Sequence, residues 1–260
     1  MIISKPSIKA VVIFASVLFV AGGTLVYASH SWGNYHWARQ SSPFTLKLGD
    51  NVSSAWDAYL GETSSDWSIS TVLDTTIVRG GTNPKNCRAT NGRVEVCSSK
   101  YGFNGWLGVA SIWISGSHIT KSTVKVNDSY FNTATYNTPP WRRLVMCQEV
   151  GHTFGLDHQD ENFSNTNLST CMDYTSDPDG PPSNEYPNAH DYEQLEAIYA
   201  HLDSTTTIGQ TVSKHFGNGN KADASDWGKK VRKDSKGRTS MYVRDLENNE
   251  KVFTFVLWAD

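Results

Sequence analysis

The sequence predicts an α+β fold in which several strands precede two helices and a small β extension ends the chain. Residues 44–48 and 122–126 alternate apolar and polar side chains, as half-buried strands do. Residues 190–202 place Tyr192, Leu195, Tyr199 and Leu202 on one face of a helix. A hydrophobic content of 38% and an aromatic content of 12% support a packed core and argue against disorder.

The length of 260 residues fits one large domain, or one domain with a small appendage. We expect a signal peptide at residues 1–28, a catalytic domain at 29–203 and a C-terminal extension at 204–260. Lys5 and Lys9 precede an uncharged apolar run, and small residues end it, as in export signals. The alternative is an uncleaved anchor, because the run approaches the length that spans a bilayer. Two glycines inside the run favour cleavage and a secreted, extracellular protein.

The formal net charge is −3, and it becomes −5 when the two lysines of the leader are removed. This acidic balance makes nucleic acid an unsuitable partner. We expect a monomer that acts on a protein or peptide, with membrane contact only through an uncleaved leader.

The first mature segment holds four aromatic side chains that we expect to pack onto the domain, at Trp32, Tyr35, His36 and Trp37. His30 and His36 are also candidate metal ligands, but packing roles are favoured. Asp50 or Asn51 is expected to cap a helix that carries Trp56 and Leu60. Further strands are predicted at residues 72–78, 93–96 and 106–114.

One stretch carries the chemistry: Gln148-Glu149-Val150-Gly151-His152-Thr153-Phe154-Gly155-Leu156-Asp157-His158. On a helix that begins near Trp141, residues 148 and 152 point the same way and can hold one metal ion between them. Glu149 then lies beside the metal, where it can take a proton from bound water. Gly155 permits the turn that returns His158 as a further ligand.

This stretch resembles the metzincin zinc-peptidase motif H-E-x-x-H-x-x-G-x-x-H, with the matrixins as the nearest group. Glu149, His152, Gly155 and His158 are in register, and Gln148 replaces the first histidine. The resemblance implies a Zn²⁺ ion held by Gln148, His152 and His158, with Glu149 as the general base. It also implies a twisted mixed sheet, in which residues 106–114 form the edge where an extended peptide adds as a strand.

Two downstream segments extend the resemblance to about residues 40–203. Cys171-Met172-Asp173-Tyr174 is similar to the metzincin Met-turn below the metal, and residues 190–199 are similar to the matrixin closing helix. In astacin-like and serralysin-like members the matching tyrosine approaches the zinc or the reacting carbonyl. Tyr174 is therefore a candidate catalytic residue, and a core aromatic next to Met172 is the equal alternative.

Four cysteines fit an oxidising compartment. Cys87 and Cys97 flank Asn91-Gly92, a hairpin turn signal, so we pair them. Pairing Cys147 with Cys171 ties the motif helix to the Met-turn segment, although Cys147 also suits a buried core position.

The C-terminal extension holds a basic segment and a predicted hairpin. Lys229, Lys230, Arg232, Lys233, Lys236 and Arg238 form the basic segment, for which a solvated loop is favoured over an acid-binding surface. Residues 241–243 and 252–258 form the predicted hairpin. Asp173, Asp177 and Asp179 leave a structural Ca²⁺ open as a second cofactor, but solvated turns are favoured because EF-hand spacing is missing.

These observations together favour a secreted zinc metalloendopeptidase. The alternative is a metzincin-fold binding or surface protein that no longer cleaves peptides, because an amide binds zinc more weakly than an imidazole. A purely structural zinc site is a third interpretation, but three protein ligands beside a glutamate suit an open site better.

Overall fold

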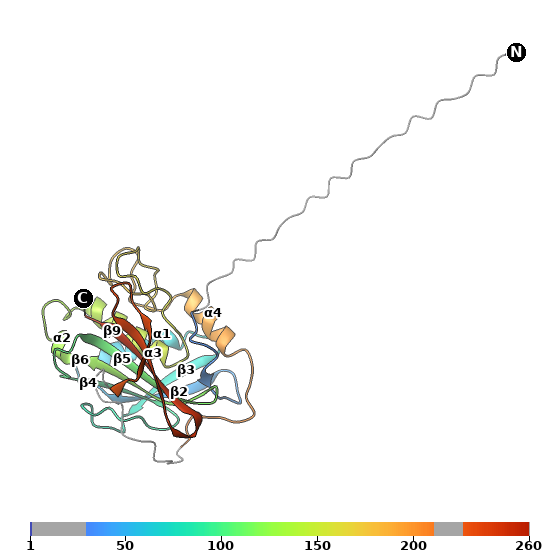
Figure 1. Cartoon of the computed structure of the whole chain (residues 1–260), viewed down its shortest axis with the longest axis horizontal. Helices are drawn as coiled ribbons and strands as arrows, with labels where there is room; N and C mark the ends of the chain where they lie inside the picture. Colours follow the sequence, from blue (N-terminus) through green and yellow to red (C-terminus); the bar gives the residue numbers. More distant parts are fainter. Residues whose placement is uncertain (2–29, 211–225, 260) are drawn as a thin grey trace.

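The computed structural model describes residues 1, 30–210 and 226–259, so the predicted leader at 1–28 lies outside the described residues except for Met1. The core is a nine-stranded mixed sheet in the order β3-β2-β4-β6-β5-β9-β8-β7, with β1 beside β6 (Figure 1). The strands are β1 (His36–Trp37), β2 (Phe44–Asn51), β3 (Leu73–Arg79), β4 (Val94–Ser99), β5 (Trp106–Ser115), β6 (His118–Asn127), β7 (Lys229–Lys233), β8 (Thr239–Asp245) and β9 (Glu250–Trp258). The helices are α1 (Asp57–Trp67), α2 (Asp128–Phe131), α3 (Pro139–His152), α4 (Ala189–Ile198) and the short 3-10 helix η2 (Glu247–Asn249).

The sheet changes direction at β5. Strands β3, β2, β4 and β6 pair in parallel, whereas β5 runs antiparallel to both β6 and β9. The predicted strands at 44–48, 72–78, 93–96, 106–114 and 122–126 are all present. The predicted C-terminal hairpin is also confirmed, because β8 and β9 pair antiparallel.

The prediction that residues 106–114 form a free sheet edge is wrong. Strand β9 pairs along β5 from Trp106 opposite Trp258 to Ser115 opposite Glu250. The alignment is stabilised because β9 buries Phe255, Val256 and Leu257 almost completely. The edge of β5 that was expected to accept a peptide is therefore occupied by β9 of the same chain.

The predicted start of α1 is also wrong. Strand β2 runs through Asn51, which is opposite Cys97 in the sheet, and α1 starts only at Asp57. Asp50 accepts a hydrogen bond from the Val52 amide, so it stabilises the turn after the strand instead of capping the helix.

Helix α3 packs closely against α1 and against the segment around Met172. A side chain at Gly151 would place its Cβ 2.7 Å from the Met172 sulfur and 2.8 Å from the Trp67 ring, so only glycine allows this approach. The Trp67 indole nitrogen donates to the Cys147 carbonyl at 3.2 Å. Leu144, Val145 and Met146 of α3 are fully buried.

Asn188 caps the closing helix α4. The Asn188 side chain accepts from the amides of His190 and Asp191, and Asp191 completes a capping box. The Asp191 carboxylate also accepts from the Thr170 hydroxyl at 2.6 Å and contacts the His30 ring at 3.0 Å. Helix α4 ends at Ile198, so Tyr199 is buried beyond the helix, whereas Leu202 is exposed.

Both predicted disulfides, Cys87–Cys97 and Cys147–Cys171, are present. The hairpin that motivated the first pairing is absent, because β4 lies between the parallel strands β2 and β6 and Cys87 lies outside the strands. The second disulfide joins α3 to the Met-turn segment. Two disulfides fit a protein that folds in an oxidising compartment. None of the described helices is long and apolar enough to span a membrane.

Candidate metal centre

The end of α3 and the turn after it bring two histidines together. Helix α3 ends at His152, and the chain turns at Gly155, whose φ is +103°. A Cβ at Gly155 would lie 2.6 Å from the Tyr35 carbonyl oxygen, so the turn requires glycine for space as well as for conformation. The turn places the Nε2 atoms of His152 and His158 2.8 Å apart.

The hydrogen bonds of the two rings determine which nitrogens carry protons. His152 Nδ1 lies 2.9 Å from the Leu156 carbonyl oxygen, and His158 Nδ1 lies 2.6 Å from a Glu161 carboxylate oxygen. Both contacts need a donor on the histidine, so each Nδ1 carries the proton and each neutral ring presents a bare Nε2. Two nitrogen lone pairs therefore face each other.

Burial keeps both rings neutral. Desolvation lowers the pKa of His152 well below its ordinary value, and a positive charge on the neighbouring His158 would lower it further. Desolvation, followed by the Arg232 charge, lowers the pKa of His158 to about 3. Two neutral rings with facing lone pairs form a site for a cation such as Zn²⁺, which neutral imidazole binds through its bare nitrogen.

Gln148 lies fully buried one turn before His152. Its amide nitrogen donates to the Cys171 carbonyl oxygen at 2.7 Å, while its amide oxygen has no hydrogen-bond partner. A buried polar oxygen without a partner costs free energy unless water or a cation satisfies it. The hydrogen bond to Cys171 thus fixes the amide with its oxygen available as a ligand.

Glu149 is also fully buried, and no side chain among the described residues hydrogen-bonds its carboxylate; its polar neighbours are the backbone groups of Ala110 and Leu257. It packs against β5 at Gly108, where a Cβ would lie 2.4 Å from one of its oxygens. Burial raises the pKa of this carboxyl well above its ordinary value, and the nearby backbone of Ala110 and Leu257 opposes the rise only in part. An adjacent metal cation would favour the carboxylate.

Tyr174 lies at the site but is held by the C-terminal strand. Its ring centroid is 4.4 Å from that of His158, and its hydroxyl donates to the Val256 carbonyl oxygen at 3.0 Å. The Met172 sulfur packs against Gly151 of α3. The hydroxyl of Tyr174 is thus close to the histidine pair but bonded to β9.

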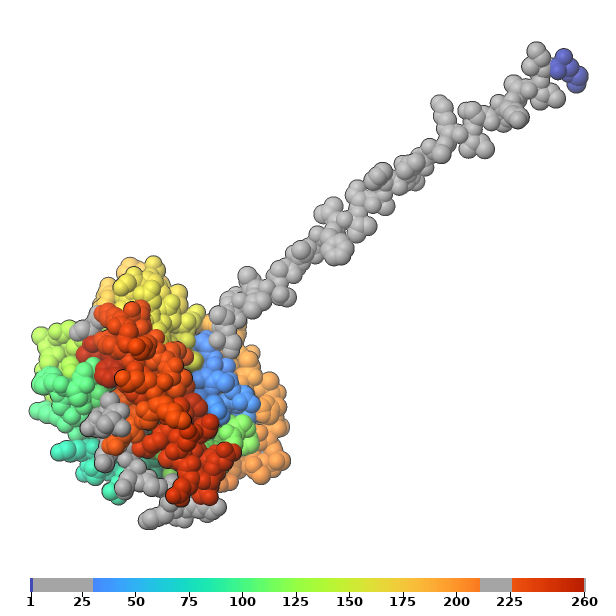
Figure 2. Space-filling view, viewed as in Figure 1, coloured from blue at the N-terminus to red at the C-terminus, as the bar shows by residue number. Residues whose placement is uncertain are grey.

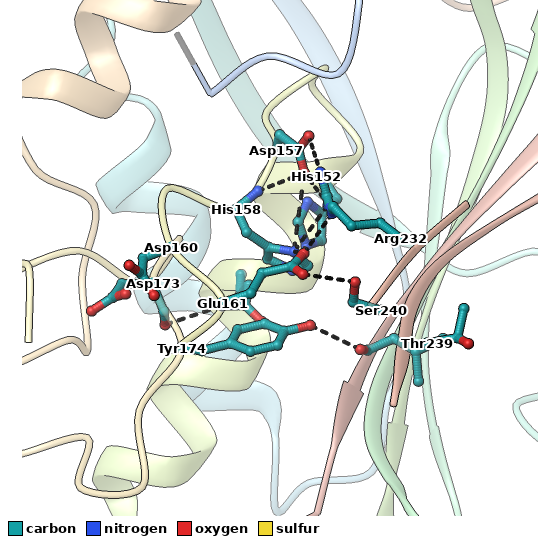
Figure 3. Close-up of polar contacts among 12 residues, drawn as sticks. His152, Asp157, His158, Asp160, Glu161, Asp173, Tyr174, Arg232, Thr239 and Ser240 are labelled. Atoms are coloured by element: carbon teal, nitrogen blue, oxygen red, sulfur yellow. Dashed lines mark hydrogen bonds and ion pairs between the residues drawn. The ribbon is translucent and has the colours of Figure 1, made fainter. Parts of the chain in front are cut away.

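Arg232 is a site residue that the sequence analysis missed. The basic segment was expected to be a solvated loop, but residues 229–233 form strand β7, and the Arg232 guanidinium bonds Asp157 and Glu161 (Figure 3). These two acids and His158 form a cluster of potential metal ligands, in which Arg232 already supplies the positive charge. A single arginine among exposed lysines gives no periodic signal that would have revealed this role.

Phe255 was missed as well. Its ring stacks on the His152 ring, with the centroids 4.3 Å apart and the planes 13° from parallel. In Figure 2 the C-terminal strands, coloured orange-red to red, extend across the middle of the visible face. The apolar run of β9 was recognised as a strand of the C-terminal hairpin, but its pairing with β5 was not predicted from the sequence.

The three aspartates considered for Ca²⁺ do not form one of the ligand clusters found among the described residues. Asp173 instead accepts hydrogen bonds from the Leu168 amide and the Asn184 side chain. Burial, more than the neighbouring Asp160, raises the pKa of Asp173 to about 6.

No family model matches the chain, and no curated protein matches it. Among solved structures, the chain is similar to that of myroilysin, with a TM-score of 0.37 and 11% identity over 64% of this chain and 97% of that chain. A likeness of this degree does not transfer a function, so the function is argued from the site itself.

Proposed function

We propose that this chain is a secreted zinc-dependent metallopeptidase that hydrolyses peptide bonds. The observation that carries the proposal is the pair of neutral imidazoles, His152 and His158, whose bare Nε2 atoms face each other at 2.8 Å. The unpartnered oxygens of Gln148 and Glu149, both buried in α3, add an amide ligand and a base. A zinc ion bound there would supply a Lewis acid and an acidified water.

Each protein group then has a separate task. His152 and His158 would hold the ion, and their Nδ1 hydrogen bonds to Leu156 and Glu161 fix the ring orientations. Glu149 accepts the proton of the attacking water and later passes it to the leaving amine. The Tyr174 hydroxyl becomes a donor to the developing oxyanion once it leaves the Val256 carbonyl.

The position of β9 makes the described structure a closed form of the proposed enzyme. An extended substrate would bind by pairing with β5, and β9 already fills that edge. Phe255 lies on His152, and β7 delivers Arg232 to the acids beside His158. Substrate binding therefore requires displacement of the C-terminal strand from β5.

The second candidate is a binding protein that has lost peptidase activity. Two observations favour it: an amide stands in place of an imidazole at Gln148, and β9 occupies the edge of β5. In that case the buried Glu149 has no chemical task.

Zinc analysis and peptidase assays on the purified mature chain separate the two candidates. The peptidase proposal predicts about one zinc at this centre and cleavage of casein or a fluorogenic peptide mixture that stops with 1,10-phenanthroline and returns with added zinc. A protein that holds zinc here but cleaves no peptide, even with β9 loosened by the Arg232 substitution described below, supports the second candidate. A protein without zinc at this centre contradicts the peptidase proposal and leaves the second candidate.

A further inference from the structure

A second group of histidines, separate from the candidate peptidase site, surrounds one carboxylate. Asp203 Oδ1 lies 3.4 Å from His36 Nε2, 3.1 Å from His118 Nε2 and 3.6 Å from His201 Nε2. Four ligand atoms placed ~2.0–2.1 Å from a central zinc form a tetrahedron with edges of about 3.3 Å. The three distances to the Asp203 oxygen bracket that edge length.

The fold brings these residues together from three distant parts of the chain. His36 and His118 are register partners in the parallel strands β1 and β6, so their side chains extend from the same face. His201 and Asp203 follow the closing helix α4. The His36 ring makes edge contacts with the His118 and His201 rings, at centroid distances of 5.0 and 4.8 Å.

Hydrogen bonds orient the ligand atoms before any metal binds. Asp203 Oδ2 accepts from the Arg39 amide at 3.0 Å, and the Asp203 amide donates to the Arg39 carbonyl at 2.8 Å. This exchange fixes the carboxylate and leaves Oδ1 for the histidines. His36 Nδ1 lies 2.8 Å from the Asn34 carbonyl oxygen, so it carries the proton and its bare Nε2 faces Asp203 Oδ1.

A carboxylate oxygen surrounded by imidazole nitrogens is stabilised by a positive charge placed between them. His36 and Asp203 are buried, with side chains 5% and 8% exposed, so water does not screen this contact. His118 and His201 are 32% and 58% exposed, which gives an ion a route from solvent. The most compact ligand set is His36, His201 and Asp203, whose ligand atoms all lie within 4.8 Å of one another.

We propose that His36, His201 and Asp203 form a second Zn²⁺ site, with His118 beside it. The ion would be bound by the Nε2 atoms of His36 and His201 and by Asp203 Oδ1, with water completing the coordination. It would join the first mature segment to the segment after α4. Such a cross-link stabilises the native state by closing long loops of the unfolded chain.

The test uses zinc alone as the probe, with the purified mature chain and two substitutions. His201→Ala removes a largely exposed ligand, and Asp203→Asn removes the charged one. Leu202→Ala is the matched control, because Leu202 is exposed between them and contributes no ligand. We expect each ligand variant to hold one zinc fewer than the parent, to bind the lost ion at least ~10-fold more weakly and to lose part of the zinc-dependent rise in Tm. Leu202→Ala keeps the parent values.

Equal zinc content and an equal zinc-dependent Tm shift in the parent and the ligand variants would overturn the proposal and leave a hydrogen-bonded histidine cluster. If the parent holds a single zinc, the variants show which centre holds it. Loss of that ion in His201→Ala supports this site, and its retention contradicts it.

Discussion

The Phe255 ring lies nearly parallel on the His152 ring, with centroids 4.3 Å apart, so the C-terminal strand covers the proposed metal ligand directly. The covering strand is anchored at a second point, where β7 directs Arg232 to Asp157 and Glu161. The two contacts make access to the site depend on how firmly residues 229–258 are held. This dependence gives the first prediction.

Arg232→Gln should raise peptide hydrolysis at equal zinc content. The substitution removes the charged hydrogen bonds that hold β7 to the acids beside His158, so β9 leaves β5 more often. Lys230→Gln is the matched control, because Lys230 is exposed on the same strand. The measurement is kcat/KM on a fluorogenic peptide together with zinc content. A rate at or below that of the parent, with zinc retained, would show that these anchors do not limit access.

Glu149→Gln should lower kcat/KM by ~10²–10⁴-fold while the zinc content stays the same. The amide has the shape of the carboxylate but cannot accept the proton from water. Glu149 is fully buried without a side-chain hydrogen-bond partner among the described residues, so the substitution removes a desolvation cost and should not lower Tm. Hydrolysis at the parental rate would remove Glu149 from the mechanism.

Gln148→His should bind zinc at the first centre ~10-fold or more tightly. An imidazole is the better zinc ligand, and the helix position one turn before His152 is unchanged. The new side chain loses the hydrogen bond to the Cys171 carbonyl, so the gain in affinity should come with a small loss of metal-free stability. Competition with a chromophoric chelator measures the affinity, with exposed Gln40→His as the control. Identical affinities of the parent and the Gln148 variant would mean that residue 148 does not face the metal.

Lys125→Met should stabilise the protein at pH 7 by about 1–3 kcal/mol. Burial in β6 lowers the pKa of Lys125 from 10.5 to about 8, so the charged form is costly in the folded state. Below pH 8 Lys125 is charged in both states of the parent, so the folded parent bears the full desolvation cost of that charge. Between pH 8 and 10.5 the unfolded chain binds more protons than the folded one, so the parent's stability rises with pH. Urea unfolding at pH 7 and pH 9 checks both statements, with exposed Lys47→Met as the control. A Lys125→Met protein no more stable than the parent at pH 7 would contradict the assignment.

The order of strands along the chain was readable because alternation of apolar side chains depends only on local geometry. Residues 44–48 and 122–126 carry that pattern, and both are strands. The start of α1 was not readable, because Asn51 is held in β2 by its pairing opposite Cys97, a contact between segments far apart in sequence. The pairing of Cys87 with Cys97 was predicted correctly from a hairpin signal that the parallel sheet overrides.

The sequence by itself determined the local arrangement of the motif residues in the candidate site. The spacing from Gln148 through Gly155 to His158 predicts two histidines on one metal, because helix periodicity and a glycine turn depend on neighbouring residues alone. The tertiary structure decided which residues surround this motif. Phe255 reaches His152, Arg232 reaches Asp157, and His36 reaches Asp203 only through the sheet and the chain path after α4. These contacts join residues that lie far apart in the sequence, so no local sequence pattern predicts them.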